Sequence, residues 1–91
     1  MAEGDGRPVK RSLTLQGHRT SVSLEGPFWH AFRELAARRG MTLNALAAQI
    51  DEARGTSSGL ASAIRVEILT DLQERAAKND KSRTSPPGPQ L

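Results

Sequence analysis

The sequence of 91 residues contains no cysteine and no tyrosine, and aromatic residues make up only 3% of it. The absence of cysteine excludes structural disulfides and thiolate metal sites, which often stabilise chains this short. The two histidines, His18 and His30, cannot complete a structural zinc site without carboxylates. Apolar residues are 36% of the chain, so one subunit has little to bury. We therefore expect oligomerisation to supply the missing stability.

The sequence also lacks the features of membrane proteins, secreted proteins and common enzymes. No apolar run approaches the roughly 20 residues that span a bilayer, and the N-terminal stretch lacks the apolar core of a signal peptide. We therefore expect a cytoplasmic protein with no membrane partner. The sequence also has no cysteine nucleophile, no Ser-His-Asp set in a recognisable context, no glycine-rich phosphate loop and no metal motif. These absences predict that the protein is not an enzyme and uses no cofactor and no metal.

Composition divides the chain into three parts. Residues 1–9 contain two acidic residues, two glycines and a proline, and we expect them to form a flexible arm. Residues 76–91 are polar and hold three of the five prolines, which predicts a disordered tail. The folded domain is therefore expected over residues 10–75. The net charge of +3 moderately favours an anionic partner.

The strand signal lies near the N-terminus, where apolar and polar residues alternate on both sides of Gly17. The second stretch, residues 20–24, needs a mate for its backbone groups. Two solutions are open: a hairpin with residues 11–15 of the same chain, or pairing with residues 20–24 of a second subunit. We favour the second solution because it also enlarges the core, and we expect a mainly α-helical chain with one short N-terminal strand.

Three helices are expected after the strand. Gly26 is a tolerated N-cap and Pro27 suits the first helical position. Gly40 stands where a left-handed residue would end this helix, and Thr42 is a natural N-cap for the next one. A third helix follows the break at residues 55–59 and carries an apolar stripe formed by Leu60, Ile64, Ile68 and Leu72.

A specific signature connects these elements. It reads Lys10-Arg11-Ser12, Thr14, Gly17-His18, Thr20-Ser21, Ser23-Leu24-Glu25 and Phe28-Trp29, and it is followed by Gly40-Met41-Thr42 between two helices. In these residues the chain resembles the ribbon-helix-helix superfamily of the Arc and methionine repressors, and within it a bacterial subfamily with the KRSxTxxGHxTSxSLE…FW signature. The resemblance covers about residues 10–72.

The resemblance implies an intertwined homodimer in which two N-terminal strands form an antiparallel ribbon between subunits, with an additional C-terminal helix. It also implies that the ribbon enters the major groove of DNA while backbone amides at the start of the second helix face phosphates. In this chain those amides belong to Thr42, Leu43 and Asn44. The dimer core is expected to contain Val22, Leu24, Trp29, Phe32, Leu35, Leu46 and Ile50.

Strand alternation and charge select the residues that would contact DNA. If Thr20, Val22 and Leu24 point inward, residues 19, 21 and 23 point outward. Residues 7–24 contain four bases and no acid. We therefore expect DNA contacts from Lys10, Arg11, His18, Arg19, Ser21 and Ser23. In this hypothesis the DNA-binding surface exists only where strands of two subunits meet, and a hairpin within one chain would remove it.

These observations lead to two main hypotheses about function, beside a third in which the protein is a monomer with a hairpin within one chain and binds RNA or nothing. The first is a dimeric, sequence-specific DNA-binding protein, a bacterial transcriptional regulator whose partners are a second copy of itself and double-stranded DNA. The alternative is a protein-interaction module, similar to an antitoxin or a docking adaptor, with weak or absent DNA binding. In either case the third helix offers a surface for a further protein partner.

Overall fold

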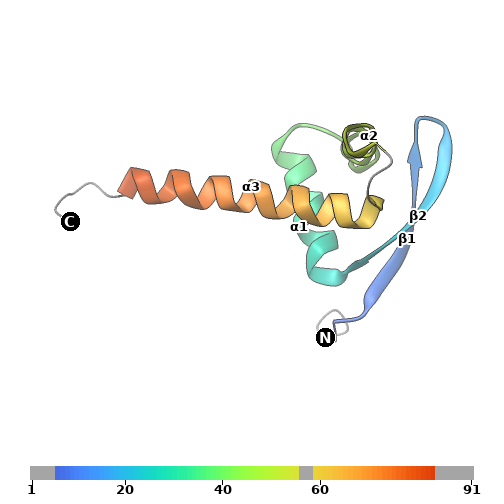
Figure 1. The fold of residues 1–91 in the computed structure, drawn as a ribbon, viewed down its shortest axis with the longest axis horizontal. Coiled ribbons are helices and arrows are strands. Elements are labelled where there is room, and N and C mark those ends of the chain that lie inside the picture. Colours follow the sequence, from blue (N-terminus) through green and yellow to red (C-terminus); the bar gives the residue numbers. More distant parts are fainter. Residues whose placement is uncertain (1–5, 56–58, 84–91) are drawn as a thin grey trace.

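The computed structural model describes residues 6–55 and 59–83. Two strands form an antiparallel hairpin, which lies at one end of the molecule, and three helices follow it (Figure 1). The elements are β1 (Pro8–Leu15), β2 (His18–Glu25), α1 (Gly26–Arg38), α2 (Leu43–Arg54) and α3 (Leu60–Arg83). The hairpin places one face against the helices, and this packing decides which of its side chains remain available to a partner.

The pairing of the strands differs from the predicted one. Both β1 and β2 are eight residues long, and β2 pairs over its whole length with β1 of the same chain, from Leu15 opposite His18 to Pro8 opposite Glu25. The expectation of a single short strand without a mate in its own chain is therefore wrong, and one edge of β2 is already occupied by β1. The reason is the turn at Gln16 and Gly17, which is tight enough to return the chain directly onto itself.

A single chain closes its own core. Thirteen apolar side chains with at most 7% exposure form one buried cluster to which both strands and all three helices contribute. This cluster includes all of the residues that were expected to form a dimer core: Val22, Leu24, Trp29, Phe32, Leu35, Leu46 and Ile50. The structure therefore assigns these side chains to the core of one subunit, because the hairpin and α3 cover them without a partner.

The sequence signals for the helix ends are largely confirmed. Gly40 has a positive φ of 66°, its amide donates to the Ala37 carbonyl, and the Met41 amide donates to the Ala36 carbonyl. This is the Schellman arrangement that ends helices at a glycine. Thr42 caps α2, since its Oγ1 accepts a hydrogen bond from the Ala45 amide at 3.0 Å. At the start of α1 the prediction is displaced by one residue.

The residue in the N-cap position of α1 is Glu25, and Gly26 is already helical and buried. The Glu25 side chain makes no capping hydrogen bond and is engaged elsewhere, as described below. Pro27 lies in the first turn, where its missing amide removes no intrahelical hydrogen bond.

The third helix is longer than predicted. It continues past residue 75 to Arg83 and projects beyond the other helices (Figure 1), and β1 begins at Pro8, inside the predicted arm. Ile64 and Ile68 are buried, whereas Leu72 of the same predicted stripe is 46% exposed. Residues 1–5 and 84–91 of the predicted arm and tail lie outside the described residues. Within the part of the chain that is described, none of the helices combines the length and apolar character needed to cross a membrane.

Candidate nucleic-acid interface

The hairpin owes its register to its turn. Gln16 and Gly17 both have positive φ, 53° and 86°, which is the geometry of a type I′ turn and matches the twist of the flanking strands. A two-residue turn of this kind makes Leu15 and His18 a hydrogen-bonded pair, so pairs alternate from there between hydrogen-bonded and non-hydrogen-bonded. The register in turn fixes which face of the ribbon each side chain occupies.

One face of the hairpin is apolar and the other is polar. Leu13 and Leu15 of β1 and Val22 and Leu24 of β2 are buried against the helices. Because successive side chains point to opposite faces, the intervening residues point away from the core, and nearly all are exposed. The cross-strand pairs on this outward face are Lys10 with Ser23, Ser12 with Ser21, and Thr14 with Arg19. We call these six residues the ribbon face.

The ribbon face brings together four of the six residues that were predicted to contact DNA, namely Lys10, Arg19, Ser21 and Ser23. It adds Ser12 and Thr14, which the sequence reasoning missed. The strand pattern alone could have found them, because both alternate with Leu13 and Leu15. The hairpin within one chain is the arrangement that was expected to remove the DNA-binding surface, and its two strands together form a polar outer face.

Arg11 occupies the opposite face from the ribbon face. It lies across from Val22, and its guanidinium carbon is 5.5 Å from the centre of the Trp29 ring, a distance typical of a cation–π contact. The Trp29 Nε1 atom donates a hydrogen bond to the Val9 carbonyl at 2.8 Å. Arg11 therefore helps to cover the buried tryptophan, which separates it from the other predicted DNA-binding side chains.

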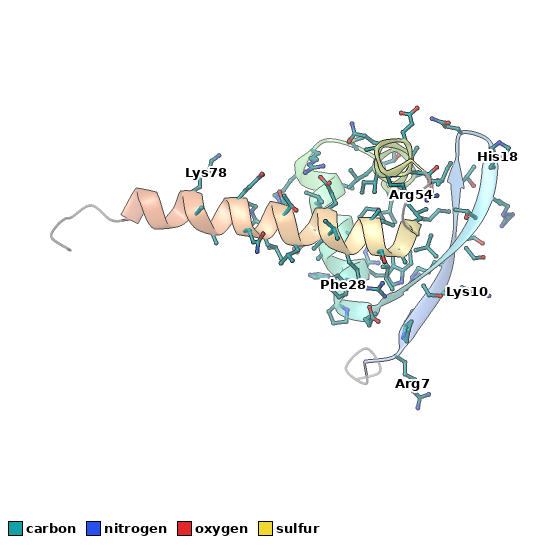
Figure 2. All side chains as sticks on the ribbon, viewed as in Figure 1. Arg7, Lys10, His18, Phe28, Arg54 and Lys78 are labelled. Carbon is teal, nitrogen blue, oxygen red and sulfur yellow. The ribbon has the colours of Figure 1, made fainter. Side chains whose placement is uncertain are left out.

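His18 begins β2 directly after the turn and is exposed. Figure 2 shows Arg7, Lys10 and His18 spread along the hairpin from its open end to its turn. Near the turn His18 lines a shallow polar hollow together with Arg19, Asp51 and Arg54. His18 is thus at the tip of the ribbon and lies outside the ribbon face.

The start of α2 lies beside the outer edge of β1. The Asn44 side-chain oxygen accepts a hydrogen bond from the Thr14 amide at 3.2 Å, so this amide points away from β2. Thr42 and Asn44 are exposed and Leu43 is half-buried. The three residues predicted to present amides to phosphate therefore flank the ribbon on its β1 side, and Asn44 also fixes the distance between the ribbon and α2.

The acidic residue at the end of the ribbon is matched by a base from α3. The Glu25 carboxylate accepts hydrogen bonds from Arg65 Nη2 at 2.8 Å and Nε at 3.1 Å. These bonds hold the pKa of Glu25 below its ordinary value of about 4.5, with further lowering by the backbone amide of Glu25. The carboxylate is therefore ionised at neutral pH, and the Arg65 charge offsets the repulsion it would otherwise exert on a nearby phosphate.

Two other bases are used within the fold. Arg38 Nη2 lies 2.6 Å from the Asp71 carboxylate, and Arg39 Nη2 lies 3.0 Å from the Glu67 carboxylate. Both contacts join the end of α1 to α3. The structure therefore gives both arginines acidic partners within the fold.

Comparisons with known proteins agree with this arrangement. A family described as the ribbon-helix-helix domain matches residues 8–72. An uncharacterized protein from Bordetella pertussis Tohama I has a similar solved structure, with a TM-score of 0.69 and 34% sequence identity, covering 90% of this chain and 69% of that one. No curated protein matches the chain. The match over residues 8–72, which spans the hairpin and reaches into all three helices, means that the chain belongs to the ribbon-helix-helix domain family.

Proposed function

We propose that the protein is a homodimeric, sequence-specific DNA-binding protein that regulates transcription by placing its hairpin in the major groove. The observation that carries the proposal is the ribbon face: it presents Lys10, Arg19 and four hydroxyl groups, with no acidic residue in the sequence between residues 6 and 24. The major groove of B-DNA is wide enough for a two-stranded ribbon. Membership of the ribbon-helix-helix domain family supports the same function.

The basic side chains and the hydroxyl groups of the ribbon face would make different contributions to DNA binding. Lys10 and Arg19 lie toward opposite ends of the ribbon face, where long basic side chains reach phosphates or guanine edges. The hydroxyl groups of residues 12, 14, 21 and 23 both donate and accept, so they discriminate weakly among bases. Specificity would then depend on the basic pair and on DNA shape. The amides at the start of α2, from Thr42 to Asn44, are available for a phosphate beside the groove.

The outer edge of β2 offers a route to the dimer. In the hydrogen-bonding pattern set by the turn, the amides and carbonyls of Arg19, Ser21 and Ser23 point away from β1. Arg65 Nη2 already lies 3.5 Å from the Ser23 carbonyl, so a second copy would pair its β2 antiparallel along this edge around Arg19 and Ser21. This pairing would join two hairpins into one four-stranded sheet. A two-fold axis through the sheet predicts an inverted-repeat target.

The proposal is tested by measuring binding to DNA selected from a random pool, at two salt concentrations, by fluorescence anisotropy. We expect affinity to fall steeply with salt, because each neutralised phosphate releases counterions. Arg19→Ala should lower affinity by about tenfold and reduce the salt slope by about one.

The matched control is Arg33→Ala, which removes an exposed arginine of α1 outside the two strands and should bind as the unchanged protein does. Binding that is absent, that does not respond to salt, or that is weakened equally by both substitutions would refute the proposed function.

A further inference from the structure

We propose that the apolar part of the dimer interface is formed by the outer side of α3, where Val66, Leu69 and Leu72 of one copy pack antiparallel against the same residues of the second copy. We call these three residues the α3 stripe. The inference rests on the homodimer of the proposed function and assigns the surface that holds its two subunits together.

The reason to look outside the core is that the core is already closed. All the side chains expected to form a shared interior are at most 6% exposed in one chain, so a second copy has none of their surface to bury. Among the described residues, the exposed large hydrophobic side chains are Val9 at 37%, Val66 at 61%, Leu69 at 54% and Leu72 at 46%. Three of these four belong to the α3 stripe.

The α3 stripe is a second apolar face of the helix. Ile64 and Ile68 point into the core and are at most 3% exposed. With about 100° of rotation per residue, Leu69 at the middle of the stripe lies about 100–140° around the helix from these two residues. Leu72 lies at the edge of the stripe nearer to the core, and Val66 lies at the far edge. A helix with two apolar faces packs on two sides, and the chain itself covers only one of them.

The stripe is continuous with the edge of β2 through which the dimer would pair. Arg65, next to the stripe, reaches back to that edge, where its Nη2 lies 3.5 Å from the Ser23 carbonyl. Its guanidinium carbon is also 5.6 Å from the centre of the Phe28 ring. Phe28 and Arg65 line one apolar groove with Leu69 and Leu72, so the strand edge, this groove and the stripe form one surface.

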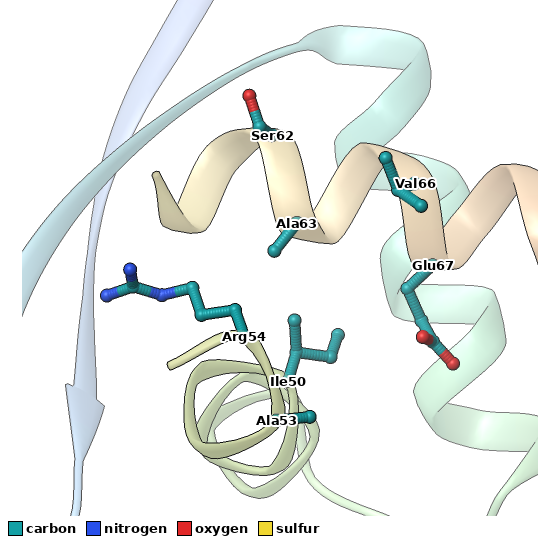
Figure 3. Close-up of a pocket in the computed structure, with 7 residues that line it drawn as sticks. All are labelled: Ile50, Ala53, Arg54, Ser62, Ala63, Val66 and Glu67. Carbon is teal, nitrogen blue, oxygen red and sulfur yellow. The ribbon is translucent and has the colours of Figure 1, made fainter. Parts of the chain in front are cut away.

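The surface combines a ridge with grooves, which are the features that a self-complementary two-fold contact uses. On the other side of Val66 a groove runs between α2 and α3, with Ile50, Ala53 and Ala63 at its base and Arg54 and Glu67 at its rim (Figure 3). Each copy therefore presents a ridge of larger side chains flanked by two grooves. Helices pack when the ridge of one enters the groove of the other.

Charge favours a second copy over a charged partner. Glu67 and Asp71 of α3 are held by Arg39 and Arg38 of α1, on the inner side of the helix. Along the stripe toward the end of α3, the next outward positions are Gln73 and Ala76, which are uncharged. The charge beside the stripe, Arg65, is already matched by Glu25 of its own chain, and the small alanine permits close approach of a second copy.

The position of α3 and the apolar area that a dimer interface requires both support a second copy of the chain as the partner. Its distal part projects past the rest of the molecule (Figure 1), and a helical segment of this length is marginal in water without packing. A pairing of β2 edges alone buries little apolar surface, whereas specific interfaces bury about 1,000 Å² or more in total. Contact along α3 supplies the additional apolar area.

Cross-linking tests the antiparallel contact directly, because the chain has no cysteine. Leu69→Cys places a single thiol at the middle of the stripe, where the two copies would meet at the axis. Thr70→Cys is the matched control, one residue along the same exposed helix and about 100° around it. Under mild oxidation the Leu69→Cys protein should form a covalent dimer and the Thr70→Cys protein should not.

The second measurement is the dissociation constant of the dimer by sedimentation equilibrium. Leu69→Glu should raise this constant at least tenfold, which is about 1.4 kcal/mol, while Thr70→Glu should change it by less than about twofold. Because Leu69 is half exposed, we expect the Leu69→Glu protein to keep its helical circular dichroism. If it does not, the cross-linking of the two cysteine variants still tests the contact.

Failure of this inference is distinguishable from failure of the proposed function. If the unchanged protein dimerises and binds DNA while Leu69→Cys fails to cross-link and Leu69→Glu dimerises normally, the α3 contact is wrong and the DNA-binding dimer stands. If the unchanged protein is monomeric at a concentration of about 100 µM, both are overturned. Equal cross-linking of the two cysteine variants also refutes the contact.

Discussion

The connection between the hairpin and the helices depends on Trp29, and Trp29→Phe tests it. The indole is 1% exposed, and its Nε1 donates a hydrogen bond to the Val9 carbonyl at 2.8 Å. The Arg11 guanidinium lies over its ring, 5.5 Å from the ring centre. Phenylalanine keeps an aromatic ring in the core. It removes the hydrogen bond that attaches the beginning of β1 and leaves a small cavity.

The expected loss is the sum of three effects. A hydrogen bond of this kind contributes about 1 kcal/mol, and the smaller ring leaves a cavity that costs about 1 kcal/mol more. Weakening the Arg11 contact removes about 0.5 kcal/mol. We therefore expect the free energy of unfolding to fall by about 2–3 kcal/mol, a large share of the 5–15 kcal/mol typical of a small domain.

Urea denaturation followed by far-ultraviolet circular dichroism measures this change, because the variant loses the only tryptophan. The control is His30→Ala. His30 is the next residue of α1, and its side chain is 67% exposed and pairs with Glu34. We expect it to change stability by less than about 0.5 kcal/mol. If Trp29→Phe changes stability by no more than the control, the indole does not attach the hairpin as described.

Three further predictions concern the turn, α3 and the ribbon end. Gly17→Val should lower the free energy of unfolding by about 1–3 kcal/mol, because φ at this position is 86°; thermal unfolding would reveal it. Ile64→Ala should lower that free energy by about 2–5 kcal/mol, since this side chain is fully buried, and Trp29 fluorescence in urea reports the change. Arg65 lowers the pKa of Glu25, so the stability from this pair is present above the ordinary pKa of about 4.5 and lost as pH falls through the depressed pKa. Glu25→Gln should therefore flatten the decline of stability in acid, measured by urea titrations from neutral pH down through the acid range, and an unchanged decline would exclude Glu25 as its source.

Local sequence signals were sufficient to predict the two faces of β2, the end of α1 and the start of α2. Val22 and Leu24 are buried while Ser21 is exposed, as the alternation requires. Gly40 and Thr42 act through their own backbone and side chain, so these local signals needed no tertiary information.

The mate of β2 could not be predicted in the same way. Type I′ turns prefer asparagine or aspartate before glycine, and here Gln16 adopts a φ of 53° that glutamine seldom takes. The turn therefore carries little sequence signal. What stabilises it is the packing of Leu13 and Leu15 beneath the helices, a tertiary effect that overrides the local preference.

The ion pairs between residues that are distant in the sequence could not be predicted from local patterns either. Arg38 and Asp71 are separated by 33 residues, and Arg65 and Glu25 by 40. Nothing local distinguishes these arginines from those that face solvent. Leu72 was assigned to the buried stripe because it follows Ile68 by four residues. At this turn α3 contacts the rest of the molecule through Asp71, which pairs with Arg38, whereas Leu72 lies at the edge of the packed face and is 46% exposed.

The alternation of the hairpin separates the buried side chains of each strand from those of the ribbon face. In β2 the even-numbered residues Val22 and Leu24 are buried, and the odd-numbered Arg19 and Ser21 lie on the ribbon face. In β1 the numbering is reversed. Because a one-residue slip would exchange the two sets, the tight turn that fixes the register also fixes which side chains meet a partner. A substitution that loosens this turn should therefore reduce binding through misplacement of Arg19, even though the turn itself lies outside the ribbon face.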